Sequence, residues 1–446
     1  KMLEVWLVTN EMVGHIMPLL PYCEELLLRG HSVTFFHPND PKFRRLVEST
    51  GLAACTSTEY ESEANLFEFM KGQVDDDSSR RPDVIVHDFF ACDARDLADL
   101  IGVPSIAIFP NLAVTVNPFT GSSSAVLWKI WCGLAIPFLE GTLARVLWTK
   151  RNFDRFRRGL GLLSEQDIYP TKYQSANPNP RLFIGHTTDD FEHNSAASLP
   201  SEVFLMVGPS LPTRVDPISE DLLQWINSQR SSGRKVVYVA FGSMYKYTKK
   251  TVRLIQQQLL DCSRGKIAIL WSLADRYQQH LLPLGDERCR WRIESYFPQA
   301  GIFRTGTVDA FVTHCGSNSV SEALLSDIPM VCCPGFADQN GNARRLALKG
   351  VGVIATRGAA GVGFALCEVL ANVEEMTKNA RDLKESMLKG GGAVMAANAI
   401  ESAPRHRDEP PSKNEGSYWA GRRIPIVWLC VVIVVLHTTL GRKVVE

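Results

Sequence analysis

Several residues in the second half of the chain have the types and spacing to bind a phosphate. A buried-looking strand, Ala310–Thr313, is followed by His314, a turn containing Gly316 and a helix expected to open at Asn318 or Ser319. A helix N-terminus presents free backbone N–H groups and about half a positive charge. A lone histidine is by default a hydrogen-bonded core residue, but the Gly316 turn directly after His314 favours a phosphate site.

A second candidate for chemistry lies near the start of the chain. His15 falls after the predicted strand Leu3–Thr9 and at the start of the predicted helix Ile16–Leu28. This is the carboxyl edge of a parallel sheet, where open α/β folds bind ligands. Histidine has an unperturbed pKa of about 6.5, so it is mostly neutral at working pH and can accept a proton from an attacking hydroxyl.

The elements that must position these residues alternate between strand and helix in two sets. The first set runs through residues 3–109, and the second runs through residues 235–333, after the Gly/Pro-rich stretch Val207–Pro217. This alternation predicts an α/β protein with two Rossmann-like, doubly wound domains, which we place at residues 1–206 and 207–401. Neither first strand is followed by G-x-G-x-x-G, so a nicotinamide or flavin cofactor is not supported.

The spacing of polar residues around the phosphate site resembles the signature of the UDP-dependent glycosyltransferases. Gln299 is followed 15 residues later by His314, Glu322 lies eight residues after that, and Asp338 and Gln339 begin sixteen after Glu322. The resemblance covers most of the chain and is densest in the second half. It implies a GT-B type fold, in which two Rossmann-like domains face a cleft, and transfer of a sugar from a UDP-sugar to a small acceptor.

The resemblance also implies a UDP-sugar contact for each matching residue. Tyr296 stands where the family stacks uracil on a Trp, and a phenol ring still offers a flat π surface. Gln299 would bond the base or ribose, and Glu322 the ribose hydroxyls. Asp338 and Gln339 would hold the hydroxyls of the donor sugar. The implied contacts of the diphosphate are Ser243, His314, Gly316, Asn318 and Ser319.

The same resemblance implies a catalytic pair. His15 occupies the family's G-H-x-x-P phrase, here Gly14 to Pro18, and would be the general base of an inverting transfer. Asp88 matches the family's partner carboxylate by its fourteen-residue spacing to Gly102. Such a carboxylate fixes the tautomer of the histidine. His87 and Asp93 are neighbours that could be confused with Asp88, and a lone aspartate at a strand end is more often a helix cap.

Some motifs have a second interpretation. Ser319-x-x-Glu322 is also a capping box, which would make Glu322 a helix-terminus residue. Asp75–Asp77 contains the D-x-D pattern of a metal-dependent glycosyltransferase class, but we expect it to lie solvated in a polar loop. The helix terminus can stabilise the leaving group, so we expect no cofactor and no metal requirement. Ser317, where plant members have Trp, matches the small residue of animal members.

Composition excludes some classes of function. The chain has 48 basic and 48 acidic residues, so we do not expect a nucleic acid partner. Its 11 cysteines are scattered without a zinc spacing. We therefore expect most of them to be buried, unpaired residues in a reducing compartment.

The C-terminus predicts a membrane anchor. Residues 402–421 are polar and read as a flexible tether, and the segment 424–440 is uncharged and mostly apolar, at the short end of a membrane-spanning helix. With its basic flanks the predicted anchor spans residues 422–443, in a membrane that we expect to be the endoplasmic reticulum. A buried core helix is the alternative. Basic residues flank both ends, so the orientation is open.

The acceptor side is less defined. Residues 126–148 are rich in Trp and Leu and could form an amphipathic membrane-surface element or a pair of core helices. Together with the anchor, they favour a lipophilic acceptor. The resemblance implies glucose or glucuronic acid as the donor sugar. The span between His15 and Asp88 is shorter than in the family. A membrane-anchored UDP-sugar-binding subunit without activity is therefore the alternative function. A nucleotide-sugar epimerase, a third possibility, should lack the Asp338–Gln339 pair.

Overall fold

The computed structural model describes residues 2–49, 55–62, 65–76, 81–88, 91–109, 181–192, 204–243, 245–263, 265–335 and 338–406. The predicted membrane helix, the Trp-rich segment 126–148 and all but the first residues of the predicted tether lie outside these ranges. Within the described part, no helix is both long and apolar enough to cross a bilayer.

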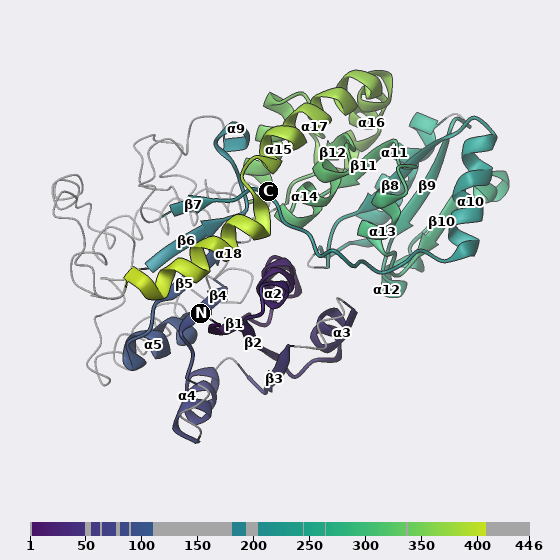
Figure 1. Ribbon diagram of the computed structural model, residues 1–446. Helices are drawn as coiled ribbons and strands as arrows, with labels where there is room; N and C mark the ends of the chain where they lie inside the picture. Colours follow the sequence, from purple (N-terminus) through teal and green to yellow (C-terminus); the bar gives the residue numbers. More distant parts are fainter. Residues whose placement is uncertain are drawn as a thin grey trace, which may run out of the picture.

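Two parallel sheets form the centres of the molecule (Figure 1). The first has the strand order β3-β2-β1-β4-β5-β6-β7 and the second β10-β9-β8-β11-β12-β13. The strands of the first sheet are β1 Glu4–Val8, β2 Ser32–Pro38, β3 Thr56–Tyr60, β4 Val84–Asp88, β5 Ser105–Phe109, β6 Arg181–Gly185 and β7 Phe204–Met206. Those of the second are β8 Lys235–Ala240, β9 Ile267–Ser272, β10 Trp291–Glu294, β11 Ala310–Thr313, β12 Met330–Cys332 and β13 Gly352–Ile354.

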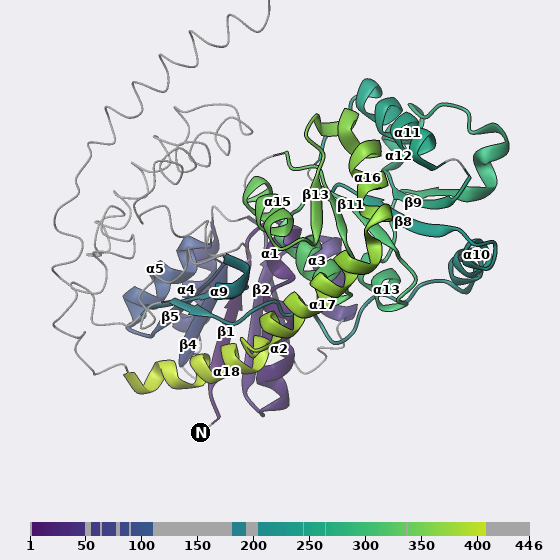
Figure 2. The same cartoon turned by 90° about the horizontal axis from the view of Figure 1, so that it is seen from above.

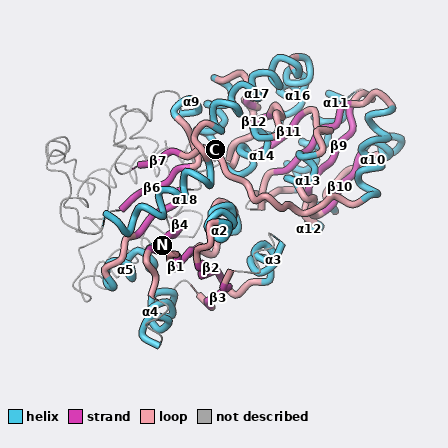
Figure 3. Tube along the Cα trace, in the orientation of Figure 1, coloured by secondary structure: helices cyan, strands magenta, loops and turns pink. Residues whose placement is uncertain are grey.

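Helices cover both faces of each sheet (Figure 3). In the first half they are α1 Val13–Ile16, α2 Leu19–Leu28, α3 Pro41–Ser49, α4 Leu66–Asp76, α5 Cys92–Ile101 and α9 Asp189–Glu192. In the second half they are α10 Glu220–Ser231, α11 Lys249–Ser263, α12 Asp275–Gln278, α13 Gln299–Arg304, α14 Ser317–Leu325, α15 Gln339–Leu348, α16 Val362–Ala371, α17 Val373–Leu388 and α18 Gly392–Ser402. Short 3₁₀ helices lie at η5 Gly285–Arg290, η6 Gly358–Gly361 and η7 Ala403–His406.

Apolar strands buried on both faces explain this layering. In β1, Val5 and Leu7 point into one core cluster, while Trp6 and Val8 point into another on the opposite face. Successive side chains of a strand alternate between faces, so a continuous apolar run requires cover on both. The two doubly wound sheets confirm the predicted pair of parallel α/β domains.

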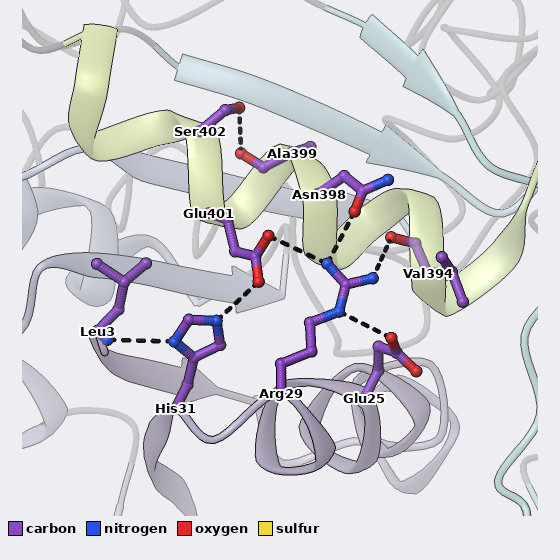
Figure 4. A network of polar contacts seen from close by, with 9 residues as sticks. All are labelled: Leu3, Glu25, Arg29, His31, Val394, Asn398, Ala399, Glu401 and Ser402. Carbon is purple, nitrogen blue, oxygen red and sulfur yellow. Dashed lines mark hydrogen bonds and ion pairs between the residues drawn. The ribbon is translucent and has the colours of Figure 1, made fainter. Parts of the chain in front are cut away.

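Helix α18 returns to the first sheet although it follows α17 of the second (Figure 2). Its Ala396, Ala397 and Ile400 belong to the core cluster of β1, β2 and α2. The Arg29 guanidinium donates to Glu25, Asn398, Glu401 and the Val394 carbonyl, and His31 Nε2 donates to Glu401 (Figure 4). Residues up to 401 were assigned to the second domain, so this helix departs from the expected division. The other boundaries stay predictions.

Three further details correct the sequence expectations. The predicted helix Ile16–Leu28 is broken at Met17–Pro18, because proline favours a helix start over a helix interior. Asp75 and Asp76 end helix α4 instead of lying in a loop. Cys262 of α11 and Cys367 of α16 form a disulfide with Cα atoms 6.0 Å apart, an exception to the expected unpaired cysteines.

Candidate active site

His15 and Asp88 lie together at the carboxyl edge of the first sheet. Strands β1 and β4 are adjacent, with Val8 opposite His87, so the segments that follow them emerge side by side. His15 Nδ1 is 2.7 Å from Asp88 Oδ2. The Asp88 side chain is 1% exposed and that of His15 14%. The carboxylate is therefore covered, whereas the imidazole can be reached.

Asn10 belongs to this cluster, and the sequence analysis missed it. Its Nδ2 donates to Asp88 Oδ1 at 2.8 Å, and its Oδ1 accepts the N–H of Met12 at 2.8 Å. A side-chain oxygen bonded to the N–H two residues later is an Asx turn, and an asparagine at a strand end is the signal that could have revealed it. Asn10 Nδ2 also lies 3.3 Å from His15 Nδ1. Because an ionised carboxylate only accepts hydrogen bonds, the short contact with Asp88 favours the tautomer in which His15 Nδ1–H donates to Asp88 Oδ2.

The neighbours that could be confused with Asp88 make other contacts. His87 Nδ1 donates to the carbonyl of Asp88 at 2.8 Å. Asp93 Oδ2 accepts the N–H of Phe67 at 3.1 Å. The carboxylate facing His15 is that of Asp88.

In the second half, α14 begins directly after a sharp turn at the end of β11. Gly316 is the N-cap residue and no side chain caps the helix, which starts at Ser317, one or two residues earlier than expected. Cys315 has a left-handed φ of 65°. The first N–H groups of α14 are thus presented at the carboxyl edge of the second sheet, as the phosphate interpretation requires.

The His314 imidazole is held between two glycines. A Cβ on Gly242 would come within 2.7 Å of His314 Nε2, and a Cβ on Gly316 within 2.6 Å. Burial lowers the pKa of His314 to about 4, so the ring is neutral at working pH. Its Nδ1 is buried and has no hydrogen-bond partner among the described residues. The default interpretation of a satisfied core histidine does not fit this nitrogen, which a ligand oxygen could satisfy.

Gln299, Ser319 and Glu322 form one polar cluster. Gln299 Nε2 donates to Glu322 Oε2 at 2.7 Å and to Ser319 Oγ at 3.3 Å. Burial raises the pKa of Glu322 to about 7, and the Gln299 hydrogen bond opposes this. Ser319 lies inside α14 and is not its N-cap, so the capping-box alternative is wrong.

The residues assigned to uracil and to one phosphate contact are accessible. Tyr296, which lies shortly before α13, is 65% exposed. Its hydroxyl donates to Asp216 Oδ2 at 3.0 Å, and this bond holds the ring in place. Ser243 is exposed in the segment after β8. Both remain predicted contacts.

Asp338 and Gln339 are buried at the start of α15. Asp338 Oδ2 accepts hydrogen bonds from Ser317 Oγ and Asn342 Nδ2, both at 2.7 Å. Gln339 Oε1 accepts the N–H of Gly335 at 2.8 Å. Burial raises the pKa of Asp338, and the bonds from Ser317 and Asn342 oppose the rise. The predicted sugar contacts therefore lie directly beside the N-terminus of α14.

One hydrogen bond joins the two candidate regions. Asn318 Nδ2, in the first turn of α14, donates to the Gly14 carbonyl at 2.7 Å. Gly14 immediately precedes His15. The turn that carries the histidine and the helix terminus that faces a phosphate are thus in direct contact, although they lie about 300 residues apart.

Within the described ranges, no group of three His, Cys, Asp or Glu side chains is placed to hold a metal. Asp75 instead lies 3.7 Å from Lys71 on the surface of α4. That the reaction needs no cofactor and no metal stays a prediction.

Comparison with known proteins relates this chain to a family of sugar-transferring enzymes. The family model described as "UDP-glucoronosyl and UDP-glucosyl transferase" matches residues 199–385, the range that contains β8 to β13 and the predicted donor site. Over this range the chain is similar to the UDP-glycosyltransferase family. The family match and the relatives below indicate a UDP-glycosyltransferase enzyme, which transfers a sugar from a UDP-sugar to an acceptor.

The sequence similarity to known glycosyltransferases extends over both halves of the chain. The chain is 26% identical to UDP-glycosyltransferase 13 of Pueraria montana var. lobata, over 74% of this chain and 79% of the relative. It is 26% identical to the oleandomycin glycosyltransferase of Streptomyces antibioticus, over 89% and 90%. The solved glycosyltransferase of kitacinnamycin has a TM-score of 0.69 at 21% identity, covering 90% of this chain and 99% of that one. This likeness confirms the GT-B fold.

Proposed function

We propose that this UDP-glycosyltransferase transfers a hexose, glucose or glucuronic acid, to a hydroxyl of a small lipophilic acceptor with inversion at the anomeric carbon. His15 is the general base and Asp88 its partner. The observation that carries the proposal is the contact of Asn318 with Gly14, which sets the His15–Asp88 pair against the N-terminus of α14.

The chemistry follows from the tautomer of His15. With Nδ1–H directed at Asp88, His15 Nε2 is left as the acceptor. It takes the proton of the acceptor hydroxyl while that oxygen forms a bond to the anomeric carbon. The bond from the anomeric carbon to the diphosphate oxygen breaks, and UDP leaves with the electron pair. Asp88 stabilises the resulting imidazolium, as an anion next to a cation does.

The leaving group would be stabilised by the second half. Its negative charge develops beside the free N–H groups of α14, which act as a fixed positive dipole. The neutral His314 can donate an N–H to a phosphate oxygen without the desolvation cost of burying a second charge. Glu322 and Gln299 would bind the ribose and base, and Tyr296 would stack on uracil.

Two relatives support the proposed class of acceptor. One matching enzyme from Crocosmia x crocosmiiflora is a myricetin 3-O-rhamnosyltransferase, 35% identical over 39% of this chain, and the Streptomyces antibioticus relative acts on oleandomycin. We therefore extend the proposal to phenolic and macrolide hydroxyls.

The experiment is a UDP-release assay with UDP-glucose and UDP-glucuronic acid against flavonol, sterol and macrolide acceptors. We expect acceptor-dependent UDP release with at least one pair, and a product with the anomeric configuration opposite to that of the donor. Calorimetric binding of UDP-glucose without turnover of any acceptor would instead support the non-catalytic binding subunit.

The membrane anchor at residues 422–443 is part of the proposal and is supported by sequence alone. The full chain should then require detergent for extraction from endoplasmic reticulum membranes, whereas a chain ending after residue 406 should not. Recovery of the full chain without detergent would contradict the anchor.

A further inference from the structure

Helix α9 belongs to the first half of the chain but packs into the core of the second. It follows β6, and its Phe191 is fully buried in the cluster that contains Tyr238, Phe311 and Leu346. This short helix is therefore a place where a residue of the first half can act on the interior of the second.

Glu192, the last residue of α9, forms a buried ion pair across the two halves. Its Oε2 lies 2.8 Å from Arg345 Nη2 of α15, with side chains 0% and 7% exposed. Glu192 Oε1 also accepts the hydroxyl of Thr187 at 2.7 Å. Two charges so deeply buried are stable only when both are paired, because removing either leaves an uncompensated charge.

Arg345 connects this pair to the predicted sugar site. Its Nη1 donates to Asn342 Oδ1 at 3.4 Å, and Asn342 Nδ2 donates to Asp338 Oδ2 at 2.7 Å. Asn342 Nδ2 also donates to the Cys315 carbonyl at 2.9 Å. Asn342 therefore presents its oxygen to the guanidinium, which holds the amide from one side, and its N–H groups to the Asp338 carboxylate and the Cys315 carbonyl. Positive charge on Arg345 polarises the amide toward Asp338.

We propose that Glu192 is a positioning residue for the donor sugar, acting through Arg345 and Asn342 on the Asp338 carboxylate. The inference rests on the proposed function, in which Asp338 holds hydroxyls of the sugar. Glu192 fixes the guanidinium, the guanidinium fixes the Asn342 amide, and the amide aligns Asp338. A residue of the acceptor half thereby influences recognition of the sugar, which is otherwise bound by the opposite half.

The effect should be specific to the sugar. UDP is proposed to contact Tyr296, Gln299, Glu322 and the α14 terminus, none of which contacts Glu192 or Arg345 in the bonds described above. If the Glu192–Arg345 ion pair only holds the two halves together, its loss should weaken the binding of UDP and of UDP-glucose equally, or lower thermal stability alone. Misalignment of Asp338 should weaken the binding of UDP-glucose and leave the binding of UDP unchanged.

The test is Glu192→Gln, with calorimetric affinities for UDP and UDP-glucose and steady-state kinetics. We expect the Kd and KM for UDP-glucose to rise about fivefold, with UDP affinity and kcat within about twofold of the wild type. Because Glu192→Gln leaves Arg345 uncompensated, the double variant Glu192→Gln/Arg345→Met removes both charges and should give the same selective loss if the single variant does not fold.

Asp190→Asn is the matched control. Asp190 lies on the same helix and also bonds across the halves, through the hydroxyl of Ser386, but has no described link to Asp338. It should change neither affinity. If the Glu192 variants weaken UDP and UDP-glucose equally, or leave both unchanged, the inference is overturned. Asp338→Asn distinguishes failure of the proposed function from failure of this inference. If Asp338→Asn does not alter the preference for UDP-glucose over UDP, the proposed sugar contact itself is wrong. If Asp338→Asn alters that preference but the Glu192 variants do not, only the positioning role of Glu192 is overturned.

Discussion

One residue of the proposed donor site, Glu322, carries an electrostatic cost that the fold alone would not require. Glu322 is buried against Gln299 with a pKa of about 7, well above its usual value of 4.5. A group whose pKa is higher in the folded state binds a proton that the unfolded chain releases. Stability therefore falls as pH rises from about 4.5 to 7, and above that the ionised carboxylate costs on the order of 3 kcal/mol.

Glu322→Gln should remove this cost. We expect the variant to be more stable than the wild type by up to about 3 kcal/mol at pH 8 and nearly equal at pH 4.5, measured by urea unfolding. Its affinity for UDP should fall, because the proposed acceptor of the ribose hydroxyls is weakened. Glu385→Gln, at an exposed position of α17, should alter neither. A stability gain that is the same at both pH values would contradict the role of ionisation.

The sequence predicts the candidate site residues better than it predicts the residues that hydrogen-bond to them. The resemblance to the family's motifs predicted His15, Asp88 and Glu322, and the structure places His15 beside Asp88 and Glu322 beside Gln299. Their roles stay predictions. Asn10 and Asp216 were not predicted, because each acts through a contact that depends on how a loop folds back. A short polar side chain at a strand end carries too little pattern to predict its partner.

At the scale of elements, the strand–turn–helix unit of β11 and α14 defines the predicted phosphate site. Its strand was predicted with the same bounds, and its helix within two residues. The sequence could not show that His314 would fill the space between Gly242 and Gly316, because that space is made by the neighbouring strand β8. The glycines are needed to make room for the ring.

Gly316→Ala tests this packing. Gly316 has φ −65°, which alanine adopts freely, so the change acts through the Cβ that would meet His314 Nε2 at 2.6 Å. We expect the imidazole to be displaced and the UDP affinity to fall about tenfold, by calorimetry.

Gly72→Ala is the control for that substitution. Gly72 lies inside α4 with open space around its Cα, so alanine should stabilise the protein by up to about 1 kcal/mol and leave UDP binding unchanged. Unaltered UDP affinity in Gly316→Ala would show that His314 does not contribute to the site.

At the scale of the whole molecule, the chain crosses between its halves more than once. Helix α9 enters the second core, and α18 completes the first. Sequence patterning predicted two α/β domains, since alternation of strand and helix is a local signal. It grouped residues up to 401 with the second domain, whereas α18 packs on the first sheet. The small apolar residues of α18 do not indicate which sheet they cover, and the deciding contacts with Arg29 and His31 come from the far end of the chain.

Ile400→Ala measures what α18 contributes. Ile400 is fully buried in the first core, so its truncation should cost about 2–5 kcal/mol in urea unfolding, as large-to-small changes in cores do. Val394→Ala, on the same helix but 52% exposed, should cost less than about 1 kcal/mol. Equal losses in the two variants would mean that α18 does not complete the first core.

The central claim is that the first half supplies the base and the second half holds UDP, and His15→Ala tests it most directly. Transfer and UDP affinity should be measured on the same preparation, by UDP release and by calorimetry. We predict that transfer falls by at least about 100-fold while the Kd for UDP stays within about twofold. Parallel loss of transfer and UDP affinity, or retention of transfer, would contradict the division of roles between the two halves.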